Sequence, residues 1–215
     1  MTRITRVCVA LLLGWSVACH HSARSGSPPS DAVLPALSVF AGQRIIVTPT
    51  ASVRAPDSLG WVRQLAGARE TARRLDTSIV SALESRGLTA RWILPPDLVR
   101  SYERNRTYAA DPYLLVVDQL RSMRFKTGDR YGEPLSSQLR TMIALHEDTR
   151  YVLLPVELRF EGQGTSGRAV LRLALLDPRA AEAKWVGDVQ GDGAASAALA
   201  MQSVATRLAS LFVAP

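Results

Sequence analysis

Three glycines between two apolar stretches have the spacing that first suggests chemistry. Gly162, Gly164 and Gly167 form the pattern G-x-G-x-x-G, which in a dinucleotide-binding turn lets the backbone approach a pyrophosphate. Such a turn follows a strand that is buried on both faces and precedes most of a doubly wound sheet. Here charged and apolar residues alternate before Gly162, and 48 residues follow Gly167. The pattern therefore predicts the loop of a glycine-rich hairpin and no nucleotide cofactor.

Four carboxylates are candidates for acid–base chemistry: Glu147, Asp148, Asp188 and Asp192. A periplasmic hydrolase or ligand-binding protein would need them to converge in one cleft, and we keep this as the alternative function. We also expect Asp192 to cap the last helix. The sequence has no G-x-S-x-G nucleophile turn and no Walker phosphate loop. We therefore expect a protein that is not an enzyme.

Metal binding is not expected either. His20 and His21 have no third ligand nearby in the sequence. Asp188 and Asp192 lack the spacing of a calcium loop. The prediction is that the protein has neither a metal site nor a cofactor.

The amino terminus has the pattern of an export signal. Arg3 and Arg6 precede an apolar run that ends at Ala18 and is too short to cross a bilayer. The stretch S-V-A-C at 16–19 resembles a bacterial lipobox with Ser16 at the usual leucine position. This resemblance implies a lipoprotein signal peptide at 1–18, lipidation of Cys19 and, since the next residue is not Asp, an outer-membrane anchor that faces the periplasm. Simple secretion after cleavage near the same place is the alternative.

The remaining chain divides into a tether and one domain. Residues 19–42 are rich in Ser, Pro, Gly and Ala, which predicts a flexible tether. Residues 43–215 have the length of a single α/β domain. The net charge is +7, of which Arg3 and Arg6 leave with the signal peptide. The other basic residues are scattered, so we expect a solvated surface and no nucleic-acid partner.

The periodicity of the apolar residues predicts alternating strands and helices. Strands are expected at 44–48, 89–94, 151–161, 168–176 and 183–190, and helices at 58–86, 97–103, 112–123, 135–146 and 194–212. Gly87 is expected to end the first helix, and Gly60 and Gly67 weaken its beginning. The strand 151–161 is expected to be half-exposed because Glu157, Arg159 and Glu161 alternate with apolar residues. The order predicts an α/β (α+β) fold, in which helices pack on a mixed sheet of about five strands that ends in an antiparallel meander.

Four of these segments carry a family resemblance: RIIVTPT (44–50), LDTSIVSALESRGLTARW (75–92), DTRYVLLPVEL (148–158) and LRLALLDPRAAEAKWVGDVQG (171–191). The last places Asp177 and Trp185 on two strands joined by a short turn. Together the segments resemble the amino-terminal domain of TolB and its relatives, which include the envelope lipoproteins CsgG and LpoB. The resemblance covers about residues 43–212 and implies a TolB-like fold. The stretch 102–134 departs from the pattern and is predicted to be an insertion.

The function favoured by these observations is that of a membrane-tethered envelope lipoprotein. It would act by protein–protein interaction, as an accessory in assembly, secretion or cell-wall synthesis. The insertion is rich in residue types that are common in interfaces, and the candidate partner-binding residues are Tyr102, Tyr108, Tyr113, Phe125 and Tyr131. An exposed sheet edge is the other candidate surface. The partner is not identified by the sequence, and assembly into a homo-oligomer stays open.

Overall fold

The computed structural model describes residues 36–56, 59–61, 64–147, 149–163 and 165–213. They belong to one compact unit, Leu34–Pro215. Its helices are η1 (Ser38–Phe40), α1 (Ala68–Ser85), α2 (Pro95–Arg104), α3 (Asp118–Arg121), α4 (Leu135–Ala144) and α5 (Ala197–Ser210), and its strands are β1 (Ile45–Val47), β2 (Val53–Arg54), β3 (Tyr151–Gln163), β4 (Ser166–Asp177) and β5 (Glu182–Gln190). The signal peptide, Cys19 and His20–His21 lie outside the described residues.

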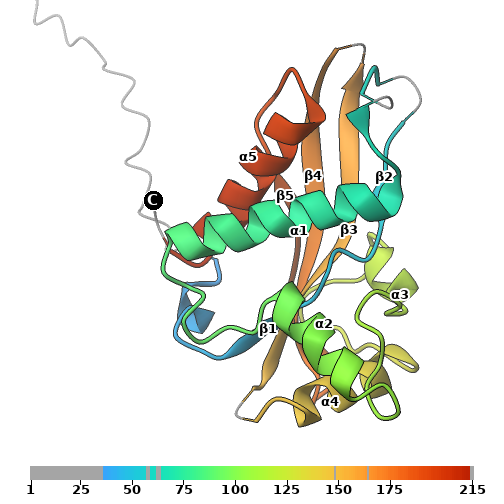
Figure 1. Cartoon of the computed structure of the whole chain (residues 1–215), viewed down its shortest axis with the longest axis vertical. Helices are drawn as coiled ribbons and strands as arrows, with labels where there is room; N and C mark the ends of the chain where they lie inside the picture. The colour runs from blue at the N-terminus through green and yellow to red at the C-terminus, as the bar shows by residue number, and fades with distance from the viewer. Residues whose placement is uncertain (1–35, 57–58, 62–63, 148, 164, 214–215) are drawn as a thin grey trace, which may run out of the picture. The chain divides into compact units, whose positions relative to one another are not determined.

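The five strands form one mixed sheet in the order β1-β3-β4-β5. β1 and β2 both run parallel to β3 and pair with different parts of the same edge, while β3, β4 and β5 form an antiparallel meander. The predicted fold class is therefore confirmed. Figure 1 shows the long β3–β4 hairpin rising above the rest of the sheet.

One predicted strand is wrong and one strand was missed. The segment 89–94 contributes a single bridge, between Ile93 and Ile46. Its first half closes a turn in which Trp92 N–H donates to the Thr89 carbonyl, and Pro95, which follows, has no N–H for a ladder. The fifth strand is instead β2, whose two residues were too few to give a periodic signal.

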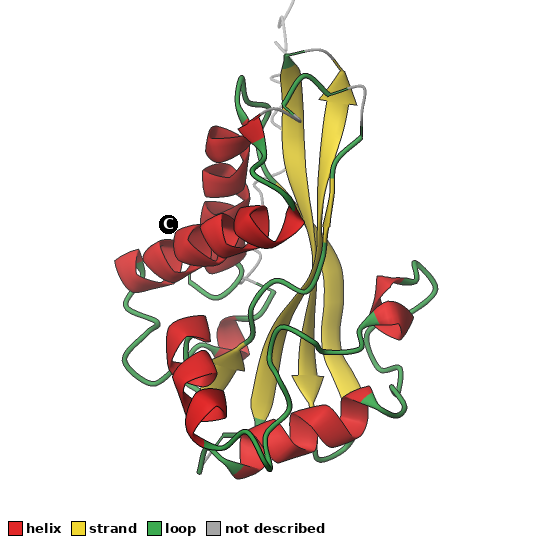
Figure 2. Ribbon diagram, turned by 45° about the vertical axis from the view of Figure 1, so that its right-hand side comes forward, coloured by secondary structure: helices red, strands yellow, loops and turns green. Residues whose placement is uncertain are grey.

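Helices cover the sheet on both faces and create two apolar clusters (Figure 2). The first cluster packs α1 and α5 against one face and includes Trp61, Leu75 and Phe212. The second packs α2, α3, α4 and the segment 115–131 against the other face. The helices on both sides bury β1 and most of β4, while β5 at the edge stays mostly half-buried.

A β-bulge in β3 decides which face its residues occupy. Val156 is the extra residue, because Pro155 pairs with Leu173 and Glu157 with Arg172. Glu157 thereby enters the polar side of the sheet beneath α3 and is only 4% exposed. The expectation that Glu157 lies on an exposed face is therefore wrong, since the bulge and the covering helix were not visible in the alternation.

Glycines mark the ends of α1 and the tip of the hairpin. Gly67 precedes the helix with φ of 92°, and Gly87 follows it with φ of 69°. The N–H of Gly87 donates to Glu84 and that of Leu88 to Leu83, which is the Schellman arrangement. Gly162 pairs with Gly167 across the β3–β4 hairpin, so the hairpin interpretation of the glycine pattern is confirmed.

Two predicted boundaries are wrong. Leu37 is fully buried, and its N–H donates to the Leu211 carbonyl at 2.8 Å, so the tether predicted for 19–42 extends too far along the chain. The helix predicted for 112–123 shrinks to the four residues of α3. Asp111 Oδ1 accepts the N–H of Tyr113 at 2.9 Å, and this turn competes with a helix start.

Candidate partner-binding surface

The five aromatic residues predicted to bind a partner divide into two groups. Phe125 is 6% exposed and Tyr131 is 3% exposed, and both belong to the second apolar cluster. Tyr102 and Tyr113 are half-buried and Tyr108 is 77% exposed. Only the last three therefore present side chains to a partner in this structure, because the rings of the other two are used by the core.

Other exposed apolar side chains lie near Tyr108 in the sequence. Six large apolar residues of the described chain are strongly exposed, and four of them lie between residues 108 and 123: Tyr108, Leu114, Val116 and Met123. We call these four side chains the 108–123 surface. Exposed apolar side chains that are concentrated in one stretch of a charged protein are typical of an interaction site.

Alternation along an extended segment explains how this surface forms. Leu115 and Val117 point into the second apolar cluster, while Leu114 and Val116, which alternate with them, point outward. In the helix predicted for 112–123, Leu114 and Met123 would share a stripe with Val117 and Leu120, but both side chains are exposed. The run L-L-V-V at 114–117 fits a helix and a strand equally well, so the period could not be assigned from the sequence.

Hydrogen bonds to α4 hold the segment in place. The Val116 N–H donates to Gln138 Oε1 at 3.1 Å, and Gln138 Nε2 donates to the Leu114 carbonyl at 3.3 Å. One amide side chain thus satisfies the backbone on both sides of residue 115. The outward direction of Leu114 and Val116 is fixed by the fold.

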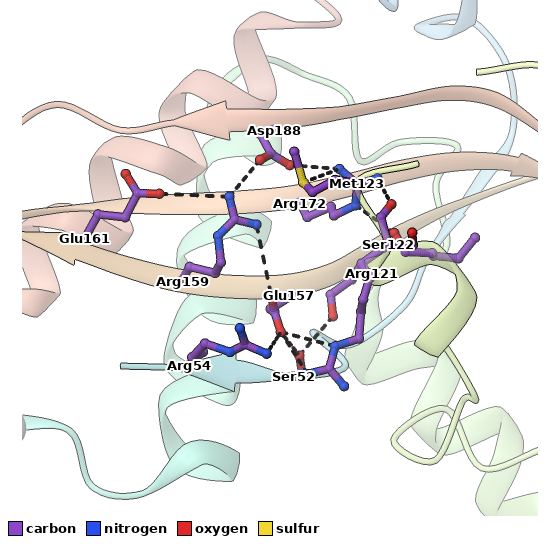
Figure 3. A network of polar contacts seen from close by, with 12 residues as sticks. Ser52, Arg54, Arg121, Ser122, Met123, Glu157, Arg159, Glu161, Arg172 and Asp188 are labelled. Atoms are coloured by element: carbon purple, nitrogen blue, oxygen red, sulfur yellow. Dashed lines mark hydrogen bonds and ion pairs between the residues drawn. The ribbon is translucent and has the colours of Figure 1, made fainter. Parts of the chain in front are cut away.

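Arg172 of β4 anchors the end of the same segment to the sheet (Figure 3). Its side chain is 5% exposed. Nε donates to the Leu120 carbonyl at 2.6 Å, and Nη2 donates to the carbonyls of Ser122 at 2.7 Å and Phe125 at 2.9 Å. Nη1 donates to Asp188 Oδ1 at 3.3 Å. The guanidinium therefore binds the free carbonyls at the end of α3, where a positive charge is also favoured by the helix dipole.

Glu157 and Arg121 form a second anchor. Glu157 Oε1 accepts bonds from Arg121 Nε at 3.1 Å and Nη2 at 2.9 Å, so α3 is also tied to β3. Arg54 of β2 lies 3.6 Å from the same oxygen. Figure 3 shows Arg121 of α3 and Arg54 of β2 converging on Glu157 of β3.

Toward the tip of the hairpin the network becomes exposed. Arg159 donates to Asp188 at 2.7 Å, and Arg168 donates to Glu161 at 2.9 Å. The exposed fraction of the acidic side chains rises from 6% at Glu157 to 42% at Glu161. Each of these carboxylates is held by arginine, so the arrangement fixes the sheet face and positions α3.

The four carboxylates of the alternative hypothesis do not form one site. Glu147 precedes β3, and Asp192 follows β5, which runs in the same direction, so these two lie at opposite ends of the sheet. Asp188 bonds Arg159 and Arg172 on the sheet face. Asp148 lies outside the described residues. The predicted cleft is therefore wrong for the three described carboxylates.

Asp192 has a different role from the predicted helix cap. It bonds Arg207 and Ser203 of α5, and the bond from Arg207 is the largest cause that lowers its pKa. The residue that caps α5 is Ser196, whose side chain accepts the N–H of Leu199. The helix begins at Ala197, which is too far from Asp192 for a cap.

Within the described ranges, no three His, Cys, Asp or Glu side chains gather in a way that could hold a metal ion. In the same part of the chain, no helix has both the length and the apolar character needed to cross a membrane.

Comparison with known proteins adds one structural similarity. No protein-family model matches the chain, and no curated protein matches it. The carboxy-terminal domain of LpoB from Salmonella enterica is similar in structure over 69% of this chain and 82% of that domain, with 15% sequence identity and a TM-score of 0.34. Both the LpoB and the TolB parts of the resemblance stay predictions. A similarity of this size carries no argument about function, which must be made from the residues.

Proposed function

We propose that the chain is a lipid-anchored accessory protein of the cell envelope that binds another envelope protein through the 108–123 surface. The observation that carries the proposal is that four of the six strongly exposed large apolar residues of the described chain lie in one stretch of the sequence, at Tyr108, Leu114, Val116 and Met123. Two anchors beneath this segment, Arg172 and Glu157, hold it to the sheet. A preorganised apolar surface loses little conformational entropy on binding.

Binding is favoured over catalysis because the described candidate carboxylates lie apart and two of them are paired with arginine. Asp188 and Asp192 each bond arginine on different parts of the fold. The membrane anchor at Cys19 comes from the lipobox resemblance and is part of the proposal. It would restrict the domain to the same membrane surface as its partner, in the periplasm.

Photocrosslinking at defined positions tests the surface. A photoreactive phenylalanine analogue replaces Leu114 or Val116 in cells that produce the full chain, and Leu199 is the matched control. Leu199 is an apolar residue that is 55% exposed on α5. We expect the same discrete protein adduct from positions 114 and 116 and none from 199. Adducts that do not differ between the three positions, or no adduct at all, would contradict the proposal.

A separate experiment tests the anchor. Cells are labelled with an azide-bearing palmitate, and the wild type is compared with Cys19→Ala. We expect label on the wild type only and loss of the variant from the membrane fraction. An unlabelled wild type would show that the protein is secreted without a lipid anchor. The crosslinking experiment would then test the surface of an unanchored protein.

A further inference from the structure

A cleft of about 320 Å³ lies between α1, the beginning of α2 and Tyr113. Its walls are mostly apolar and its polar groups are few. The lining side chains are Val80, Pro95, Pro96, Val99 and Tyr113, with Arg73, Asp76 and Thr77 as the polar members. This size and composition are typical of a site for a small ligand.

Asp76 supplies a carboxylate to this cleft, and only one of its two oxygens accepts hydrogen bonds from the described part of the fold. The residue is 7% exposed. Its Oδ1 accepts bonds from the N–H of Thr50 at 2.9 Å and from the Thr50 hydroxyl at 2.6 Å. Across the described ranges, Oδ2 has no hydrogen-bond or ion-pair partner. Burial is the main cause that raises the pKa of Asp76 to about 6. No arginine or lysine of the described residues pairs with this carboxylate, so its ionised form is not compensated by a cation.

Arg73 lies one turn before Asp76 on the same helix and lines the same cleft. Its guanidinium has no ion pair among the residues that the structure describes. The neighbouring Arg74 differs, since it pairs with Glu70 at 3.2 Å. Residues three apart on a helix have Cβ atoms about 5–6 Å from each other, so one small molecule can reach both Arg73 and Asp76.

The aromatic wall is fixed before any ligand arrives. Tyr113 is held by the Asp111 carboxylate, which accepts its backbone N–H at 2.9 Å. Arg69 lies over its ring, 5.3 Å from the centroid. A wall held on both sides keeps the shape of the cleft and reduces the entropy that binding must overcome.

We propose that this cleft binds a free α-amino acid with an apolar side chain. The ammonium group donates to Oδ2 of Asp76, and the carboxylate accepts from the guanidinium of Arg73. The side chain lies between Val80, Val99 and Tyr113. The two opposite charges on one small ligand match the two charges on one helix face.

Calorimetric titration of the full chain in detergent tests this assignment. The probes are L-leucine, leucinamide, which lacks the carboxylate, and N-acetyl-leucine, which lacks the ammonium group. We expect leucine to bind and each of the other two to bind at least about ten-fold more weakly, because each removes one charged contact. These comparisons use the unaltered protein and do not depend on how a variant folds.

Three variants then assign the contacts. Asp76→Asn and Arg73→Gln should each weaken leucine binding by about ten-fold or more. Arg74→Gln, which changes the adjacent paired arginine, should leave it unchanged. No heat from millimolar leucine, equal affinity for the three probes, or equal losses in the Arg73 and Arg74 variants would each overturn the proposal. Melting curves confirm that the variants compared are folded.

Discussion

Replacement of Arg172 by Met should be among the most damaging single changes in this fold. The substitution keeps most of the side-chain volume and removes the donors. The carbonyls of Leu120 and Phe125, two buried residues, then lose their partner. Ser122 is exposed, so water can replace the bond to its carbonyl.

The magnitude follows from these bonds. A buried polar group without a partner costs about 1–3 kcal/mol, and two such carbonyls give about 2–6 kcal/mol. Loss of one member of a buried ion pair costs about 3–5 kcal/mol, but Asp188 keeps its bond from Arg159. We therefore expect Arg172→Met to lower the free energy of unfolding by about 3–5 kcal/mol and the melting temperature by ~10 °C.

Arg168→Met is the matched control, because Arg168 lies on the same strand four residues earlier. Its side chain is 47% exposed and pairs with Glu161, so the expected loss is below about 1 kcal/mol. Urea unfolding of both variants measures the difference. Hydrogen exchange should also show faster opening of 118–125 in the Arg172 variant. Equal unfolding free energies for the two variants would refute the anchoring argument.

Three further comparisons test other parts of the structure by urea unfolding. Gly162→Ala places a Cβ against the Ser166 carbonyl at a residue with φ of 143° and should lower the free energy of unfolding by about 1–3 kcal/mol. An unchanged midpoint of urea unfolding would contradict the turn geometry. Phe125→Ala should lower the free energy of unfolding by about 3–5 kcal/mol, whereas Tyr108→Ala should change it by less than about 0.5 kcal/mol. Similar losses in the two variants would contradict the assignment of Phe125 to the core and of Tyr108 to the surface. The folded pKa of Asp76, about 6, lies above its ordinary 3.8, so its stabilising contribution is complete below pH 4 and is lost as the pH rises through 6. Relative to Asp76→Asn, the wild type should therefore lose about 3 kcal/mol between pH 4 and pH 7, and parallel pH curves would exclude this role.

Local sequence signals predicted those parts of the fold that are determined by residues close together in the sequence. The alternation before Gly162 and the turn after Asp177 were sufficient to predict the β3–β4–β5 meander. Gly87 predicted the end of α1 because a left-handed residue is required there. These features depend on neighbours in the sequence, so the chain alone carries the information.

The rest depends on contacts between distant segments. Glu157 is buried because a bulge turns it toward α3, 36 residues earlier in the chain at Arg121. Arg172 lies in the predicted strand 168–176, yet its donors reach carbonyls about 50 residues away. Neither partner can be identified from periodicity. The surface residues Leu114 and Met123 were misplaced for the same reason, since their direction is set by tertiary bonds.

The positions of charged and apolar residues around α3 are the reverse of what monomer stability favours. Arg172 and Glu157 are buried beneath the segment, while Leu114, Val116 and Met123 lie above it in water. Full burial of these three side chains would contribute about 5–9 kcal/mol. Association itself costs about 4–15 kcal/mol, so the surface alone supports a weak complex. A lipid anchor at Cys19, as proposed, raises the effective concentration of a partner on the same membrane. Stable binding through this surface therefore requires the anchor as well. Cys19→Ala should reduce crosslinking at Leu114 although it leaves the surface intact.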